Sequence, residues 1–174
     1  MLIAARMMGV ATLAVSLLLL AQGLVHARVG RGSCVVGIDP CQDNTADIGT
    51  KSCNQDGACA DNSGRIHDHD CLGQDACHNN SGDVANNSCT GDSACASNSG
   101  DVGTGSCNGD DACRENSASV GTSSCKGFAA CTNNSGPIGN NACKGDRACF
   151  GNVTPREPGE CNGPPVGGKG VCEQ

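Results

Sequence analysis

The sequence predicts an all-β fold, a disulfide-stapled parallel β-solenoid of about seven 18-residue coils, whose handedness the sequence leaves undetermined. Two observations support this expectation. Cysteines recur with gaps that alternate between 6 and 12 residues, which gives a period of 18. The 16 cysteines come with 26 glycines, two phenylalanines and no tryptophan or tyrosine, so an ordinary apolar core cannot form. A helical hairpin repeat would need longer units and an apolar stripe at helical spacing, and the sequence has neither.

Each repeat unit carries small residues and one bulky aliphatic at fixed places. One unit runs from Cys89 to Ser106, and alanine precedes the second cysteine of each regular unit. A β-branched aliphatic follows further on, at Ile48, Ile66, Val84, Val102, Val120 and Ile138. We expect the cysteines, the alanine and this aliphatic to fill a thin interior. The coils would stack through parallel strand hydrogen bonds at a spacing of about 4.8 Å.

Asparagine is the most regular polar residue of the repeat. It lies three residues after the second cysteine at Asn44, Asn62, Asn80, Asn98, Asn116, Asn134 and Asn152. A primary amide both donates and accepts, so stacked asparagines are expected to form a structural ladder along the coils. A row of asparagines that faces a ligand is the alternative.

The cysteine spacing favours one bridge within each coil. A shifted scheme leaves Cys34 and Cys172 without neighbours, whereas pairing neighbours uses every cysteine. The favoured pairs are Cys34 with Cys41, Cys53 with Cys59, Cys71 with Cys77, Cys89 with Cys95, Cys107 with Cys113, Cys125 with Cys131, Cys143 with Cys149, and Cys161 with Cys172. Bridges between stacked coils stay open as an alternative, because the spacing of one coil also fits a disulfide. Zinc sites usually contain two cysteines separated by two to four residues, and this sequence has no such pair.

Four segments are expected along the chain. Residues 1–27 resemble a signal peptide, with Arg6, an apolar stretch and a cleavage site after Ala27. Residues 28–52 would form an N-terminal cap and a first irregular coil, 53–154 the regular repeats, and 155–174 a Pro/Gly-rich C-terminal cap. We therefore expect a monomer that is secreted to the extracellular space or cell surface, without stable membrane insertion after signal cleavage.

The chemistry of the side chains argues against several function classes. The formal net charge is −7 and aromatic residues are scarce, so nucleic acid is not an expected partner. No catalytic motif is present, the adjacent Asp110 and Asp111 do not form an acid/base pair, and we expect neither an enzyme nor a cofactor. The calcium-binding nonapeptide is absent too. No metal site is expected, with His67 and His69 as weak candidates because they would share a face of a strand.

The cysteine pair six residues apart, the small interior residues and a row of hydroxyl side chains resemble the disulfide-stapled antifreeze solenoids of insects. The resemblance implies an ice-binding or surface-binding face on one strand. Its residues would be Thr50, Ser52, Asn86, Ser88, Thr104, Ser106, Thr122 and Ser124. The row is interrupted at Asp68/Asp70 and at Asn140/Ala142, which weakens the implied match to an ice lattice. Val102–Cys107 also resembles the hexapeptide of left-handed β-helices, which supports a three-sided coil only.

These expectations combine into one functional hypothesis. The protein would be a secreted, non-enzymatic structural or surface-binding repeat protein that forms a rigid, disulfide-stapled rod. Its partner would be an extracellular polymer, a surface or ice. Ice binding through the Thr/Ser/Asn row is the alternative function.

Overall fold

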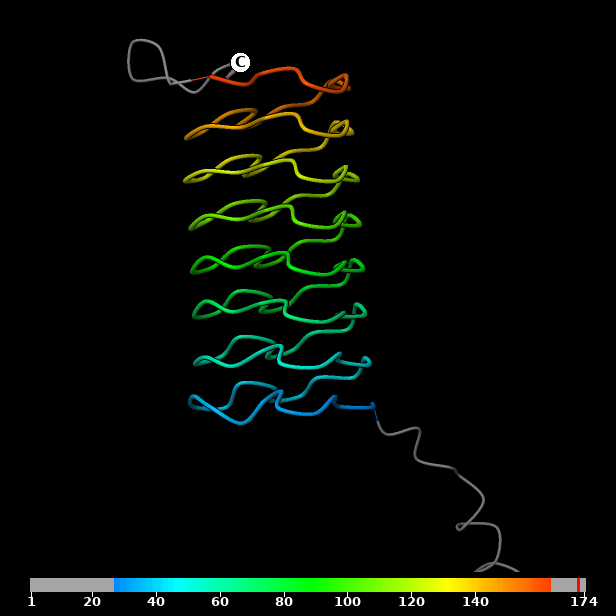
Figure 1. The fold of residues 1–174 in the computed structure, drawn as a ribbon, viewed down its shortest axis with the longest axis vertical. Helices are drawn as coiled ribbons and strands as arrows, with labels where there is room; N and C mark the ends of the chain where they lie inside the picture. The colour runs from blue at the N-terminus through cyan, green and yellow to red at the C-terminus, as the bar shows by residue number, and fades with distance from the viewer. Residues whose placement is uncertain (1–26, 164–171, 173–174) are drawn as a thin grey trace, which may run out of the picture.

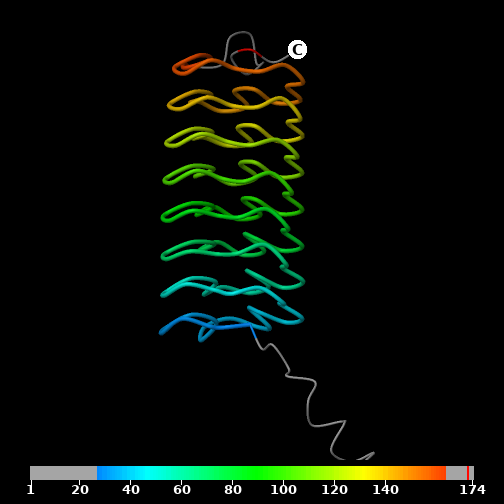
Figure 2. The same cartoon turned by 90° about the vertical axis from the view of Figure 1, so that its right-hand side faces the viewer.

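The structure is a computed structural model that describes residues 27–163 and Cys172. Residues 1–26 of the predicted signal peptide, and residues 164–171 and 173–174 of the predicted C-terminal cap, lie outside the described residues. The described chain winds in flattened turns that stack along one axis, as Figures 1 and 2 show. The turns follow one another in chain order, so each coil lies between the coil before it and the coil after it.

The β pairing between coils is limited to isolated parallel bridges. Nine such bridges occur in the described residues, and no strand longer than one bridged residue is found there. Seven of them form a single column through Val29, Ile48, Ile66, Val84, Val102, Val120, Ile138 and Arg156. The solenoid class therefore stays a prediction, although bridged partners beyond Val29 and Ile48 are 18 residues apart.

Backbone hydrogen bonds join each coil to both of its neighbours. The N–H of Val102 donates to the carbonyl of Asp83 in the preceding coil at 2.8 Å. The N–H of the next residue, Gly103, donates to the carbonyl of Val120 in the following coil at 2.8 Å. The same alternation recurs at Val84 in the preceding coil, so the register is fixed coil by coil.

Left-handed backbone conformations recur at fixed places in each coil. In the coil from Cys89 to Ser106, residues 89, 93, 95, 97 and 105 have φ between 54° and 67°. Glycine occupies the last of these places at Gly105, where it adopts this conformation without steric cost. Such residues interrupt the alternation of side chains that an extended strand would have. Sequence arguments based on strand alternation therefore fail near them.

The interior is thin and contains few large side chains. The bridged aliphatics from Ile48 to Ile138 are at most 4% exposed, and the alanines at 58, 76, 94, 112, 130 and 148 are fully buried. Neighbouring coils approach so closely that a Cβ placed on Gly91 would collide with the backbone of Gly109. The interior must therefore gain much of its stability from covalent bridges and polar ladders.

Candidate functional site

Disulfides form the first ladder of the interior, with each bridge inside one coil. The bridged pairs are Cys34 with Cys41, Cys53 with Cys59, Cys71 with Cys77, Cys89 with Cys95, Cys107 with Cys113, Cys125 with Cys131, Cys143 with Cys149, and Cys161 with Cys172. The sulfurs of Cys53, Cys59 and Cys71 lie within 4.8 Å of one another, so these bridges of neighbouring coils lie close together. No described cysteine is free, and paired sulfurs offer no thiolate to a metal ion.

The burial of the bridges differs between the middle and the ends of the stack. In the regular coils both cysteines of every pair are fully buried, as Cys77 and Cys131 are. At the first level Cys34 and Cys41 are only partly buried, because no earlier coil of the described residues covers them. At the last level Cys172 is exposed. The expectation that the cysteines fill the interior therefore does not extend to these end bridges, which lie at its edge.

Asparagines form the second ladder. The side-chain N–H of Asn98 donates to Oδ1 of Asn80 at 2.8 Å and to the carbonyl of Gly100 at 2.7 Å. Asn98 Oδ1 accepts in turn from Asn116 at 2.8 Å. The amide chain continues without interruption from Asn44 through Asn62, Asn80, Asn98, Asn116 and Asn134 to Asn152. From Asn62 onward these side chains are fully buried, so they do not face a ligand.

Serines form a third ladder inside the stack, whereas strand alternation predicts that their side chains are exposed. The sequence predicts Ser52, Ser88, Ser106 and Ser124 on an exposed face, but all four are fully buried. The hydroxyl of Ser106 donates to the carbonyl of Gly121 at 2.7 Å and accepts from the N–H of Ser124 at 3.1 Å. The left-handed residue before each of these serines turns the side chain inward. These serines cannot contact ice or a surface.

The remaining residues of the expected face are exposed but form a single column. Thr50, Asn86, Thr104 and Thr122 lie on the surface together with Asp68 and Asn140. Where an acid or amide occupies this column, it accepts a backbone N–H from the preceding coil, as Asp68 does from Thr50 at 2.6 Å. That bond holds the pKa of Asp68 below its usual range. The exposed face is therefore one residue wide in each coil.

Asp70 replaces serine in the buried column and is the one carboxylate there. Its Oδ1 accepts the N–H of Ser88 at 2.8 Å, whereas Oδ2 is buried without a hydrogen-bond partner. Burial raises the pKa of Asp70 to about 8. The side chain is fully buried, so the protonated form is favoured at neutral pH.

The histidine candidates for a metal site are not brought together with other ligands. His67 is half-buried and His69 is exposed, and neither belongs to a cluster of three metal-binding side chains within residues 27–163. His78 lies 3.7 Å from the carboxylate of Asp61 on the surface.

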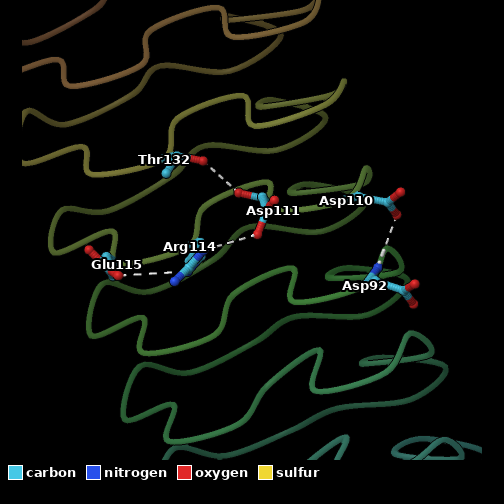
Figure 3. Close-up of polar contacts among 6 residues, drawn as sticks. All are labelled: Asp92, Asp110, Asp111, Arg114, Glu115 and Thr132. Carbon is cyan, nitrogen blue, oxygen red and sulfur yellow. Dashed lines mark hydrogen bonds and ion pairs between the residues drawn. The ribbon is translucent and has the colours of Figure 1, made fainter.

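A surface hollow that the sequence reasoning missed lies near the C-terminal end of the stack. Its volume is about 350 Å³, and both phenylalanines of the chain, Phe128 and Phe150, line it. Arg114 also lines the hollow and lies 3.5 Å from Asp111 and 3.6 Å from Glu115, and Figure 3 shows these two ion pairs. The only signal in the sequence is the restriction of phenylalanine to two neighbouring units.

The two adjacent aspartates near this hollow have different partners. Asp111 faces Arg114, whereas Asp110 accepts the backbone N–H of Asp92 at 3.0 Å, as Figure 3 shows.

The described part of the chain contains no helix that is long and apolar enough to cross a membrane.

Comparison with known proteins places the repeat in a family. The model of a domain of unknown function, DUF7640, matches residues 20–112 and 69–170, which together span most of the chain. The chain belongs to this family. It is a cysteine-rich DUF7640 repeat protein with regularly spaced disulfides, and such extensive bridging is consistent with an extracellular protein. No curated protein and no solved structure was found to match the chain.

Proposed function

We propose that this DUF7640 protein is a secreted, non-enzymatic structural protein, a rigid rod of the β-solenoid class that binds an extracellular surface. The observation that carries the proposal is the repetition of the same cross-links in successive coils. Each level has one disulfide, and the amide ladder from Asn44 to Asn152 runs through the stack. Repeats joined only to their neighbours are typical of solenoid rods.

The chemistry of the links supports an extracellular location. Eight disulfides persist only in an oxidising compartment, and they replace the large apolar core that the sequence cannot supply. Each bridge closes a short loop and stabilises the fold through the unfolded state by up to about 2 kcal/mol. A stack stapled at every level would resist opening by proteases outside the cell.

Ice binding stays the alternative function, in line with the resemblance to insect antifreeze solenoids. Its remaining support is the exposure of Thr50, Thr104 and Thr122 in one column. Because the serines are buried, the hydroxyl face is narrower than the resemblance implies. Asp68 and Asn140 interrupt it further.

Trypsin digestion of oxidised protein, beside a reduced and alkylated sample, tests the structural proposal. Lys51, Arg65 and Arg114 are exposed, yet their coils are tied to both neighbours, so the oxidised chain should resist cleavage at conditions that digest the reduced chain. Equal digestion of the two samples would contradict a stapled rod. Ice-crystal growth in the same two samples separates the functions, because the structural proposal predicts unaltered crystals in both, and growth arrest by the oxidised protein would favour ice binding.

A further inference from the structure

The surface hollow exists because one coil has small side chains between two coils with large ones. Ala129 and Thr132 lie in the central coil. The corresponding places hold Asp111 and Arg114 one coil earlier, and Arg147 and Phe150 one coil later. Backbone bonds fix this arrangement, since Ala129 N–H donates to the carbonyl of Asp110 at 2.8 Å and Arg147 N–H donates to that of Phe128 at 2.7 Å. The hollow is therefore built on the rigid part of the stack.

Phe128 differs from the residues at the equivalent position of the other coils, most of which are aspartates. The column contains Asp56, Gln74, Asp92, Asp110, Phe128 and Asp146. Its aspartates accept a backbone N–H from the preceding coil, as Asp146 does from Phe128 at 3.0 Å. A phenyl ring cannot accept this bond in the same way, and Phe128 stays 52% exposed, so it gains little from packing. An exposed ring that replaces a stabilising aspartate is expected where the surface binds something.

The charged side chains around the rings are balanced in sign. Arg114 lies between Asp111 and Glu115, at 3.5 and 3.6 Å (Figure 3). The guanidinium of Arg147 lies 5.1 Å from the centre of the Phe150 ring. Two arginines and two acids line the hollow, which favours a neutral ligand over an anion or a cation. Their planar groups offer hydrogen-bond donors and acceptors to such a ligand.

The size and composition of the hollow indicate the class of ligand. A volume of about 350 Å³ is at the lower end of small-molecule sites, whereas a protein partner would need about 800 Å² of surface on this chain. The half-exposed Arg114 and Phe128 leave the hollow open, so an apolar molecule would stay largely in water. A sugar ring has C–H faces that are attracted to the negative face of a phenyl ring, and hydroxyl edges that pair with Arg, Asp and Asn side chains.

We propose that the hollow between Phe128 and Phe150 binds a sugar ring of a neutral glycan. This inference rests on the proposed surface-binding role and names the chemistry of the surface. Phe128 provides the stacking face, and Arg114, Glu115 and Asn133 bond to the ring hydroxyls. Asn133 also begins an N-x-Ser acceptor sequence that ends at residue 135, so a bacterial host is needed to keep the hollow free of an attached glycan.

Titration by proton NMR tests the site directly, because the chain has two phenylalanines and no tryptophan or tyrosine. Cellohexaose and N-acetylchitohexaose serve as neutral probes, and a sulfated oligosaccharide of similar length serves as the anionic probe. We expect the phenyl resonances of the oxidised protein to shift and saturate with a neutral probe. Tighter binding of the sulfated probe, or no shift with either neutral probe, would overturn the proposal.

Two substitutions introduce side chains that other coils already carry at the equivalent positions. The variants should therefore keep the fold while they change the hollow. F128D restores the aspartate of the column, and A129R fills the hollow with the side chain that Arg147 places one coil later. Both are expected to weaken neutral-sugar binding about tenfold or more. Q74D changes the same column outside the hollow and should leave binding unaltered. Retained affinity in both F128D and A129R would contradict the assignment.

Trypsin resistance, measured on the same samples, distinguishes the failure of this inference from the failure of the proposed function. A resistant rod that binds no neutral sugar would overturn the sugar site and leave the structural proposal standing. Equal digestion of the oxidised wild-type chain and its reduced form would contradict the structural proposal itself.

Discussion

Replacing Asp70 by serine is expected to stabilise the protein at pH 8 and to remove much of its loss of stability with rising pH. Burial raises the pKa of Asp70 in the folded state to about 8, from 3.8 in the unfolded chain. The folded state therefore holds this proton more tightly. Its contribution to stability is complete below pH 3.8 and is lost as the pH rises to about 8. The loss has an upper bound of about 6 kcal/mol.

The structural reason is that an ionised Asp70 has no adequate partner. Oδ1 accepts one N–H, from Ser88, and Oδ2 is buried without any hydrogen bond. In D70S the hydroxyl enters a column that already holds Ser52 and Ser88, so the variant needs no new packing. Guanidinium unfolding of both proteins between pH 4 and 9, with disulfides intact, measures the difference.

Two control variants make the result specific to the buried carboxyl. D70N removes the charge but keeps the shape, so it should flatten the pH dependence as D70S does. D68N changes an exposed carboxyl whose pKa is lowered by the N–H of Thr50, and it should keep the wild-type slope above pH 5. If D70S and D70N retained the wild-type slope, the buried carboxyl of Asp70 would not be its source.

Removal of one asparagine from the middle of the ladder is expected to destabilise the whole stack. N98A deletes the donor to Asn80 and Gly100 and the acceptor for Asn116. These groups are buried, so the loss leaves unsatisfied polar atoms together with a cavity. The expected cost is about 3–5 kcal/mol in the free energy of unfolding. Denaturant unfolding under non-reducing conditions measures it.

Position along the ladder provides the control for this prediction. Asn44 begins the ladder and is partly exposed, so water can replace its bonds and N44A should cost much less than N98A. S99A changes an exposed side chain beside Asn98 and should stay within about 0.5 kcal/mol of wild type. Equal losses in the free energy of unfolding for N44A and N98A would mean that burial does not determine how much each asparagine of the ladder stabilises the fold.

The repeat itself is readable from the sequence because several residue types recur at one spacing. Cysteine positions alone give the 18-residue period, and bridged residues such as Val84 and Val102 are separated by the same number. A buried asparagine is harder to expect, yet a regular spacing of amides along the units points to a ladder. These features depend on the period and not on the path of the chain within a coil.

The orientation of individual side chains could not be predicted in the same way. Strand alternation placed Ser106 outward, but the left-handed turn at Gly105 reverses the direction of the side chain that follows. Strand alternation likewise assigns Asp70 to an exposed row of side chains, although its carboxyl group is buried. Phe128 and Phe150 line one hollow because of how two coils stack, which no local pattern reveals.

Mapping of the disulfides in the oxidised protein tests whether each coil contains one internal bridge. Digestion at acidic pH, where disulfide exchange is slow, followed by mass spectrometry without reduction, identifies the linked cysteines. We expect internally bridged peptides, such as one that joins Cys89 to Cys95 and another that joins Cys107 to Cys113. Peptides that link Cys95 to Cys107 would contradict this expectation, because those bridges would join neighbouring coils.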